Sequence, residues 1–215
     1  MPVISRFWKN LGFPVLIIYS NSGDRRKKQM KTAVIFAPGC EEGEALTIVD
    51  IFRRAEIRCD MIGLDEKEIT GAHDITMLCD EVISEELKDY DMVILPGGYG
   101  GAEAMKNHAL LQSVLKEMNK NGKYIAAICA APIALDEAGV LEGKRFTCYP
   151  TTAAKIHTGI HTDDKVCVDG NLITSQGPAT AWAFAYKLVD VLGGDSLTVK
   201  KRMVYFNAFD VQEDE

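Results

Sequence analysis

The sequence contains no pair of cysteines at CxxC spacing, no internal repeat and no apolar run long enough to cross a bilayer. The apolar run at residues 11–19 is too short, because a spanning helix needs about 20 apolar residues. The six cysteines lie far apart, which is typical of a reduced intracellular protein and argues against a disulfide framework. We therefore expect a cytoplasmic protein that has no membrane partner.

A surplus of positive charge is also lacking. The formal net charge is -7 at pH 7, and no stripe of Lys and Arg is present. A surface of this sign repels phosphate backbones, so we expect no nucleic-acid partner. The composition, with 47% hydrophobic and 26% charged residues, is that of a globular protein, and the length fits one domain.

The two ends of the chain differ in composition from the middle. Basic residues and the short apolar run in residues 1–29 weakly resemble a signal peptide, but no A-x-A-like cleavage site follows. We predict that residues 1–29 form an N-terminal extension outside the core. The predicted domain then covers residues 30–205, and residues 206–215 form a solvated acidic tail.

Within the domain, short apolar runs alternate with runs of helical period. Strand-like runs of four to seven residues that are apolar throughout are typical of parallel sheets buried on both faces. Their alternation with helices predicts an α/β domain with a doubly wound, mostly parallel sheet. The expected strands are residues 32–37, 58–64, 91–95, 124–128 and 172–175, and the expected helices are 44–55, 108–119, 131–138 and 179–192.

Cys129 directly follows an expected strand and precedes an expected helix, with small residues on both sides. A sharp strand-to-helix turn of this kind is the arrangement of a nucleophile elbow. A helix N-terminus would also lower the pKa of the thiol. The alternative is a buried structural cysteine, and the local sequence does not decide between the two.

Glu44 lies where the loop after the first strand becomes a helix, beside Glu41 and Glu42. Carboxylates in the first turn of a helix usually serve as partners of the helix dipole, and we interpret Glu41 and Glu42 in this way. In a parallel sheet, however, this loop can lie beside Cys129. A glutamate against a thiolate is pushed towards its protonated form, so Glu44 could donate a hydrogen bond or transfer a proton.

The glycine-rich segment at residues 97–101 does not fit a nucleotide-binding motif, because it has neither a GxGxxG register nor a following Lys-Ser/Thr. The backbone N–H groups of Gly98 and Ala130 could instead form an oxyanion hole, the alternative being a plain tight turn.

His157 and His161 have i,i+4 spacing, but Gly159 interrupts the segment and no third ligand is evident. We interpret both histidines as solvent-exposed, and we predict no metal and no cofactor.

Four segments in order carry a resemblance to a known family: Glu41-Glu42-x-Glu44, residues 95–98 (LPGG), 126–132 (AAICAAP) and 174–178 (TSQGP). Together they resemble the ThiJ/PfpI superfamily, specifically its Parkinsonism-associated DJ-one branch. The resemblance implies a flavodoxin-like fold and a homodimer. It also implies an oxidation-sensitive nucleophile at Cys129, a partner at Glu44 and backbone donors at Gly98 and Ala130.

Two positions depart from the family pattern. Protease-like and larger glyoxalase members carry histidine directly after the cysteine, where this chain has Ala130. A Cys-His dyad of adjacent residues is therefore absent, which argues against a peptidase. Many members of the DJ-one branch have histidine where this chain has Tyr149. A phenol titrates far above an imidazole, so Tyr149 is a possible accessory hydrogen-bond donor and a poor base near neutral pH.

The leading hypothesis is an enzyme of reactive-carbonyl defence, with glyoxalase activity that needs no glutathione or deglycase-like activity on methylglyoxal adducts. Cys129 would attack an aldehyde carbon, Gly98 and Ala130 would hold the oxygen anion, and Glu44 would move the proton. The rival is a non-enzymatic oxidative-stress sensor or redox-regulated chaperone in which Cys129 becomes a sulfinate. A cysteine peptidase or amidase is the third possibility.

Overall fold

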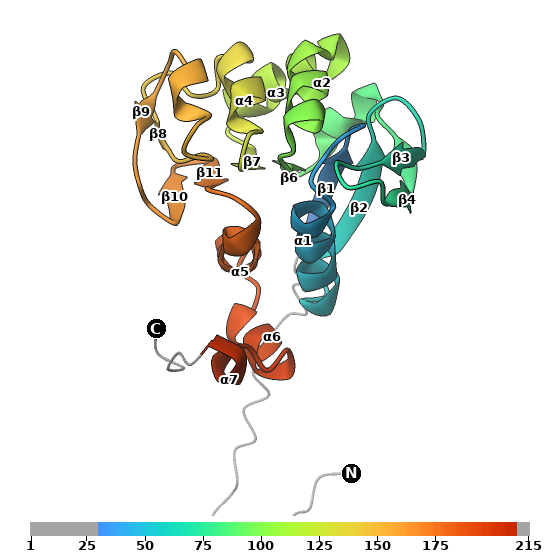
Figure 1. The fold of residues 1–215 in the computed structure, drawn as a ribbon, viewed down its shortest axis with the longest axis vertical. Coiled ribbons are helices and arrows are strands. Elements are labelled where there is room, and N and C mark those ends of the chain that lie inside the picture. The colour runs from blue at the N-terminus through green and yellow to red at the C-terminus, as the bar shows by residue number, and fades with distance from the viewer. Residues whose placement is uncertain (1–29, 210–215) are drawn as a thin grey trace, which may run out of the picture.

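The computed structural model describes residues 30–209. The predicted N-terminal extension therefore lies outside the described residues, as do residues 210–215 of the predicted tail. A single seven-stranded sheet runs through the middle of the domain, with helices on both faces (Figure 1).

The sheet has the strand order β10-β11-β7-β6-β1-β2-β5. All neighbouring strands are parallel except β10 and β11, which pair antiparallel at one edge. Because β1 lies in the middle and the chain then proceeds outward in both directions, the sheet is doubly wound. The strands are β1 (Lys31–Phe36), β2 (Arg58–Gly63), β5 (Glu81–Val82), β6 (Met92–Leu95), β7 (Tyr124–Ile128), β10 (Val166–Asp169) and β11 (Leu172–Ser175).

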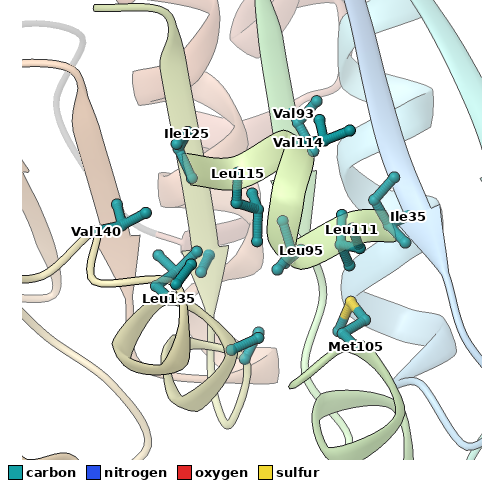
Figure 2. Close-up of a cluster of buried hydrophobic side chains, with 14 of the residues drawn as sticks. Ile35, Val93, Leu95, Met105, Leu111, Val114, Leu115, Ile125, Leu135 and Val140 are labelled. Atoms are coloured by element: carbon teal, nitrogen blue, oxygen red, sulfur yellow. The ribbon is translucent and has the colours of Figure 1, made fainter. Parts of the chain in front are cut away.

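Successive side chains of each central strand enter the two opposite layers of the core. In β1, Ala33 and Ile35 pack on one side of the sheet, whereas Val34 and Phe36 pack on the other. The first layer is covered by α2 (Tyr99–Asn107), α3 (Ala109–Lys120) and α4 (Pro132–Glu137). Figure 2 shows this layer, in which Leu111 and Leu115 of α3 lie over Leu95.

The second layer is covered by α1 (Glu42–Arg54) and α5 (Ala181–Val191), on the opposite side of the sheet in Figure 1. The short helices α6 (Ser196–Arg202) and α7 (Tyr205–Phe209) follow and pack beside the end of α5. Two small sheets lie outside the main one, formed by β3 (Glu68–Thr70) with β4 (Thr76–Leu78) and by β8 (Arg145–Phe146) with β9 (Ile160–His161). Single 3-10 turns occupy Glu85–Asp89, Ala153–Lys155 and Pro178–Thr180.

The predicted α/β architecture with a doubly wound sheet is confirmed. All the expected strands and helices are present, with ends within two residues of those predicted. The glycine-rich segment is a loop only at Gly97 and Gly98, because α2 begins at Tyr99. The domain boundary predicted at residue 205 falls inside α7, where the Tyr205 ring packs edge-on against Tyr186 at 5.2 Å between ring centroids. Among residues 30–209, no helix combines the length and the apolar character needed to cross a membrane.

Candidate active site

Three loops meet at one edge of the sheet because β1, β6 and β7 are parallel neighbours. The carboxyl ends of these strands point in the same direction, so the segments that follow them lie together. The segment after β1 leads to Glu44 in the first turn of α1. The segment after β6 holds Gly97 and Gly98, and the segment after β7 begins with Cys129.

Cys129 occupies a strained backbone conformation at the end of β7. Its φ angle is +63°, a left-handed value that residues with a side chain rarely adopt. Two hydrogen bonds hold the turn: the Cys129 N–H donates to Ser175 O at 3.0 Å, and its carbonyl accepts from the Tyr149 N–H at 2.8 Å. Cys129 is partly exposed, whereas the other five cysteines are buried. The turn therefore presents this thiol to solvent, in the manner of a nucleophile elbow.

Glu44 is fully buried beneath this turn. Its Oε2 accepts a hydrogen bond from the Gly97 N–H at 2.7 Å, and its carboxyl group interacts with the thiol of Cys129 and with the charge of Glu41. Burial raises the pKa of Glu44 to about 7, against the opposing effects of the Gly97 N–H and the thiol. The carboxyl group is thus able to gain and to lose a proton near neutral pH.

The thiol of Cys129 is not strongly acidic, and the expectation from the sequence is wrong on this point. Burial and the adjacent Glu44 carboxylate raise the pKa of Cys129 to about 12, although the N–H groups of Gly98 and Ala130 act in the opposite direction. The helix expected to lower the pKa has only six residues and begins at Pro132. The thiol is therefore less acidic than the helix N-terminus predicts, and Glu44 is the adjacent base that can remove its proton.

Glycine is required at positions 97 and 98 by the closeness of the loops. A Cβ atom added to Gly97 would lie 2.5 Å from Cβ of Cys129 and 2.9 Å from Oε2 of Glu44. Gly98 has φ +82°, and a Cβ there would collide with the carbonyl oxygen of Gly39. The close approach brings the N–H groups of Gly98 and Ala130 to the Cys129 sulfur, where they can also stabilise an oxygen anion bonded to the attacked carbon.

A pocket of about 270 Å³ opens above Cys129. Tyr149 lies on its wall, with its ring edge-on to Tyr99 at 6.4 Å between centroids. The Tyr99 hydroxyl is hydrogen-bonded to Thr151 Oγ1 at 2.8 Å, which fixes this aromatic pair. The remaining lining residues are Glu41, Ala72, His73, Gly98, Ala130 and Pro178.

Sequence reasoning missed the contribution of the β3–β4 hairpin to this pocket. His73, in the loop between these strands, lines the pocket, and no strand was expected near it. Glu42, interpreted as a partner of the helix dipole, is buried and accepts hydrogen bonds from the backbone and the side chain of His73. His157 and His161 are exposed, as expected.

One cluster in the described part of the chain has atoms close enough to surround a metal ion: Glu41, Glu42 and His73. However, Oε1 of Glu42 already accepts from the His73 N–H at 2.7 Å, and Oε2 pairs with His73 Nδ1 at 2.9 Å. Donors from within the protein thus use both oxygens of Glu42. The cluster fits a hydrogen-bonded carboxylate and imidazole pair better than a metal site.

Comparison with known proteins places this arrangement in a family. Residues 30–191 match the model of the DJ-1/PfpI family. Protein dj-1beta of Drosophila melanogaster is 42% identical over 165 residues, which cover 75% of this chain and 88% of that protein. The glutathione-independent glyoxalase DJ-1 of Schizosaccharomyces pombe is 33% identical over 173 residues, which cover 75% of this chain and 90% of that protein.

The fold agrees with these matches. The crystal structure of Drosophila melanogaster DJ-1beta superposes with a TM-score of 0.78 at 40% identity, covering 81% of this chain and 98% of that structure. It supports the flavodoxin-like fold implied by the sequence motifs. The family model, the relatives and the fold lead to one conclusion: the chain belongs to the DJ-1/PfpI family.

Proposed function

We propose that this protein converts methylglyoxal or closely related 2-oxoaldehydes to 2-hydroxy acids without glutathione. The observation that carries the proposal is the pairing of a solvent-accessible Cys129 with a buried Glu44 whose pKa is about 7. A family relative in Schizosaccharomyces pombe named a glutathione-independent glyoxalase supports it.

The first step joins the sulfur to the aldehyde carbon. Glu44 accepts the thiol proton while Cys129 Sγ attacks, so a neutral thiol becomes nucleophilic only when a substrate is present. The aldehyde oxygen gains the electron pair of the carbonyl bond, and the N–H groups of Gly98 and Ala130 stabilise its charge. Transfer of the proton from Glu44 to this oxygen gives a hemithioacetal.

The second step moves hydrogen from the aldehyde carbon to the neighbouring ketone carbon. Glu44 removes the proton from the first carbon, an enediol forms, and reprotonation of the second carbon gives a thioester of a 2-hydroxy acid. Water then hydrolyses the thioester and restores the Cys129 thiol. One carbon is oxidised and its neighbour is reduced, so the sum of methylglyoxal and water is lactic acid, and no external redox partner takes part.

Lactate production from methylglyoxal tests the proposal. Wild type should produce lactate, and Cys129→Ser should not. Glu44→Gln should lose about a hundredfold to ten-thousandfold in kcat, because an amide cannot carry a proton near neutrality. Removal of the carboxylate charge also lowers the pKa of Cys129, so Glu44→Gln should be alkylated by iodoacetamide at least as fast as wild type.

A matched control separates these effects from general damage. His157→Gln changes an exposed histidine that does not line the pocket, and it should retain wild-type lactate production. Equal lactate production by wild type and Cys129→Ser would reject the proposal. A loss of less than tenfold in Glu44→Gln would reject proton transfer by Glu44.

A specific observation also supports the redox-sensor function. A sulfinate at position 129 would meet the N–H groups of Gly98 and Ala130 and, once protonated, the Glu44 carboxyl group. Mild peroxide should then add two oxygen atoms at Cys129 before any other cysteine, as measured by peptide mass spectrometry. Glu44→Gln should change the rate at which this sulfinate is oxidised further. Oxidation that begins at a buried cysteine would exclude this function.

A further inference from the structure

Glu42 is a buried carboxylate that the proposed reaction does not use. Only 2% of the residue is exposed. Burial raises its pKa, but hydrogen bonds from His73 outweigh this effect and keep the pKa below its usual range. Glu42 is therefore an anion in the folded protein, two residues before the active-site acid Glu44.

The donors to Glu42 come from one loop, between β3 and β4. The His73 N–H donates to Oε1 at 2.7 Å, His73 Nδ1 pairs with Oε2 at 2.9 Å, and the Ile75 N–H reaches Oε1 at 3.5 Å. Gly71 in the same loop passes so close that a Cβ atom there would collide with the Glu42 side chain. Glu42 thus holds the hairpin loop on the N-terminus of α1.

This anchoring fixes the orientation of the His73 ring. Because His73 Nδ1 is hydrogen-bonded to the Glu42 carboxylate, Nε2 is the ring nitrogen that can bind a ligand. The hydrogen bond that His73 donates to Glu42 and the charges of Glu41, Glu42 and Asp74 raise the pKa of His73, which favours an imidazolium with an N–H at Nε2. The ring is two-thirds exposed and lines the pocket that also contains Cys129.

We propose that His73, positioned by Glu42, donates a hydrogen bond from Nε2 to the second carbonyl oxygen of a 2-oxoaldehyde bound at Cys129. This inference rests on the proposed function. The second carbonyl, which His73 would bind, is the group that distinguishes 2-oxoaldehydes from simple aldehydes. His73 is a substrate-binding residue in this scheme, and Glu42 is a positioning residue.

Pocket size and chemistry support this assignment. At about 270 Å³ the pocket lies below the range of roughly 300–1,000 Å³ of typical small-molecule sites, so a ligand on Cys129 is close to every wall. The N–H groups of Gly98 and Ala130 serve the carbonyl under attack, whereas the neighbouring carbonyl needs its own donor. That carbonyl becomes an enediol oxygen in the second step, and a cationic donor stabilises the charge that develops there.

The test uses protection of Cys129, which requires adduct formation and no turnover. Methylglyoxal and propionaldehyde have the same number of carbons, but propionaldehyde lacks the second carbonyl. Each is mixed with the protein for a short time before iodoacetamide, and mass spectrometry measures alkylation of Cys129. In His73→Gln, protection by methylglyoxal should need about tenfold more compound or more, and protection by propionaldehyde should not change.

Three further variants make the test specific. His73→Arg keeps a cationic donor and should keep protection by methylglyoxal within about threefold of wild type. His157→Gln should leave protection by both aldehydes unchanged. Glu42→Gln should weaken protection by methylglyoxal as much as His73→Gln does. The double variant should lose no more protection than either single variant. If Glu42→Gln does not fold, the two His73 variants decide, since that side chain is mostly exposed.

The outcomes separate this inference from the proposed function. If His73→Gln weakens protection by both aldehydes equally, or by neither, the inference is wrong even where lactate forms. If methylglyoxal protects in a His73-dependent manner but wild type forms no lactate, the inference stands and the glyoxalase function is wrong. Absence of any protection by methylglyoxal in wild type would overturn the inference, and absence of lactate as well would overturn the proposed function.

Discussion

The backbone N–H of Gly97 donates to Oε2 of Glu44 across 2.7 Å, and this bond joins the loop after β6 to the first turn of α1. The same glycine lies against Cβ of Cys129, so it contacts both partners of the reactive pair. The separation of acid and nucleophile therefore depends on the absence of a side chain at position 97.

Gly97→Ala should disrupt both stability and activity. The new methyl carbon would be 2.5 Å from Cβ of Cys129, a distance that forces the loop or the turn to move. Overpacking of a buried site costs about 1–3 kcal/mol, which thermal unfolding would detect, and lactate production should fall with it. Gly43→Ala is the control, because its Cβ would meet Glu41 Oε1 at an ordinary 3.5 Å. A Gly97→Ala protein with wild-type stability and activity would contradict the close packing of Gly97 against Cys129 and Glu44.

Alkylation of Cys129 should accelerate continuously with pH. Since burial and Glu44 raise the pKa of this thiol to about 12, the thiolate fraction grows about tenfold per pH unit through the range from pH 7 to 9. Iodoacetamide labelling read by peptide mass spectrometry measures the rate, and Cys129 should react ahead of the five buried cysteines. A plateau below pH 8 would show instead that the thiolate is stabilised in the resting protein.

The pH dependence of stability should report on Glu44. Its pKa is about 7 in the folded protein and near 4.5 when exposed, so the folded state binds the proton more tightly. The contribution of Glu44 to the free energy of unfolding has its full value below pH 4.5. This contribution declines as the pH rises from there to about 7. The decline is of the order of 3 kcal/mol.

Urea unfolding of wild type and Glu44→Gln at several pH values isolates this contribution, because the other ionisable groups are shared. The stability of wild type relative to the variant should fall across that pH range. A constant difference would mean that Glu44 titrates near its ordinary pKa.

Thr174→Val should destabilise the segment that leads to Tyr149. Thr174 Oγ1 accepts from the buried Thr147 N–H at 2.8 Å, and valine would leave this donor unpaired. The expected loss is about 1–3 kcal/mol in denaturant unfolding. Thr70→Val, at an exposed threonine pair, should change stability by no more than about 0.5 kcal/mol. Equal effects of the two substitutions would contradict a special role for Thr174.

Most of the central strands and helices could be predicted from the sequence because each forms a short apolar run with a clear period. Helix α2 was missed, because glycines occupy its first turn. The predicted strands at residues 124–128 and 172–175 coincide with β7 and β11. Small elements were missed for the opposite reason. Strands β3, β4, β8 and β9 have only two or three residues each, and tertiary contacts determine them.

Residues of the candidate site could be predicted only where a distinctive local sequence lies in a segment that follows an expected strand. Cys129, Glu44 and Gly98 are such residues. His73 carries no local signal, since the hydrogen bond to Glu42 that places it joins two separate elements. The acidity of the thiol was predicted wrongly because burial depends on the whole fold.

The homodimer stays a prediction, which analytical ultracentrifugation of the full chain would test.

The left-handed backbone at Cys129 has a consequence for how this protein can change by mutation. A non-glycine residue in that conformation costs about 1–3 kcal/mol, and the cost is present whether or not a substrate arrives. Glycine would occupy the turn without the steric penalty but would have no nucleophile. A laboratory selection for heat resistance alone would therefore not retain the cysteine, and only selection for its chemistry would keep position 129 unchanged.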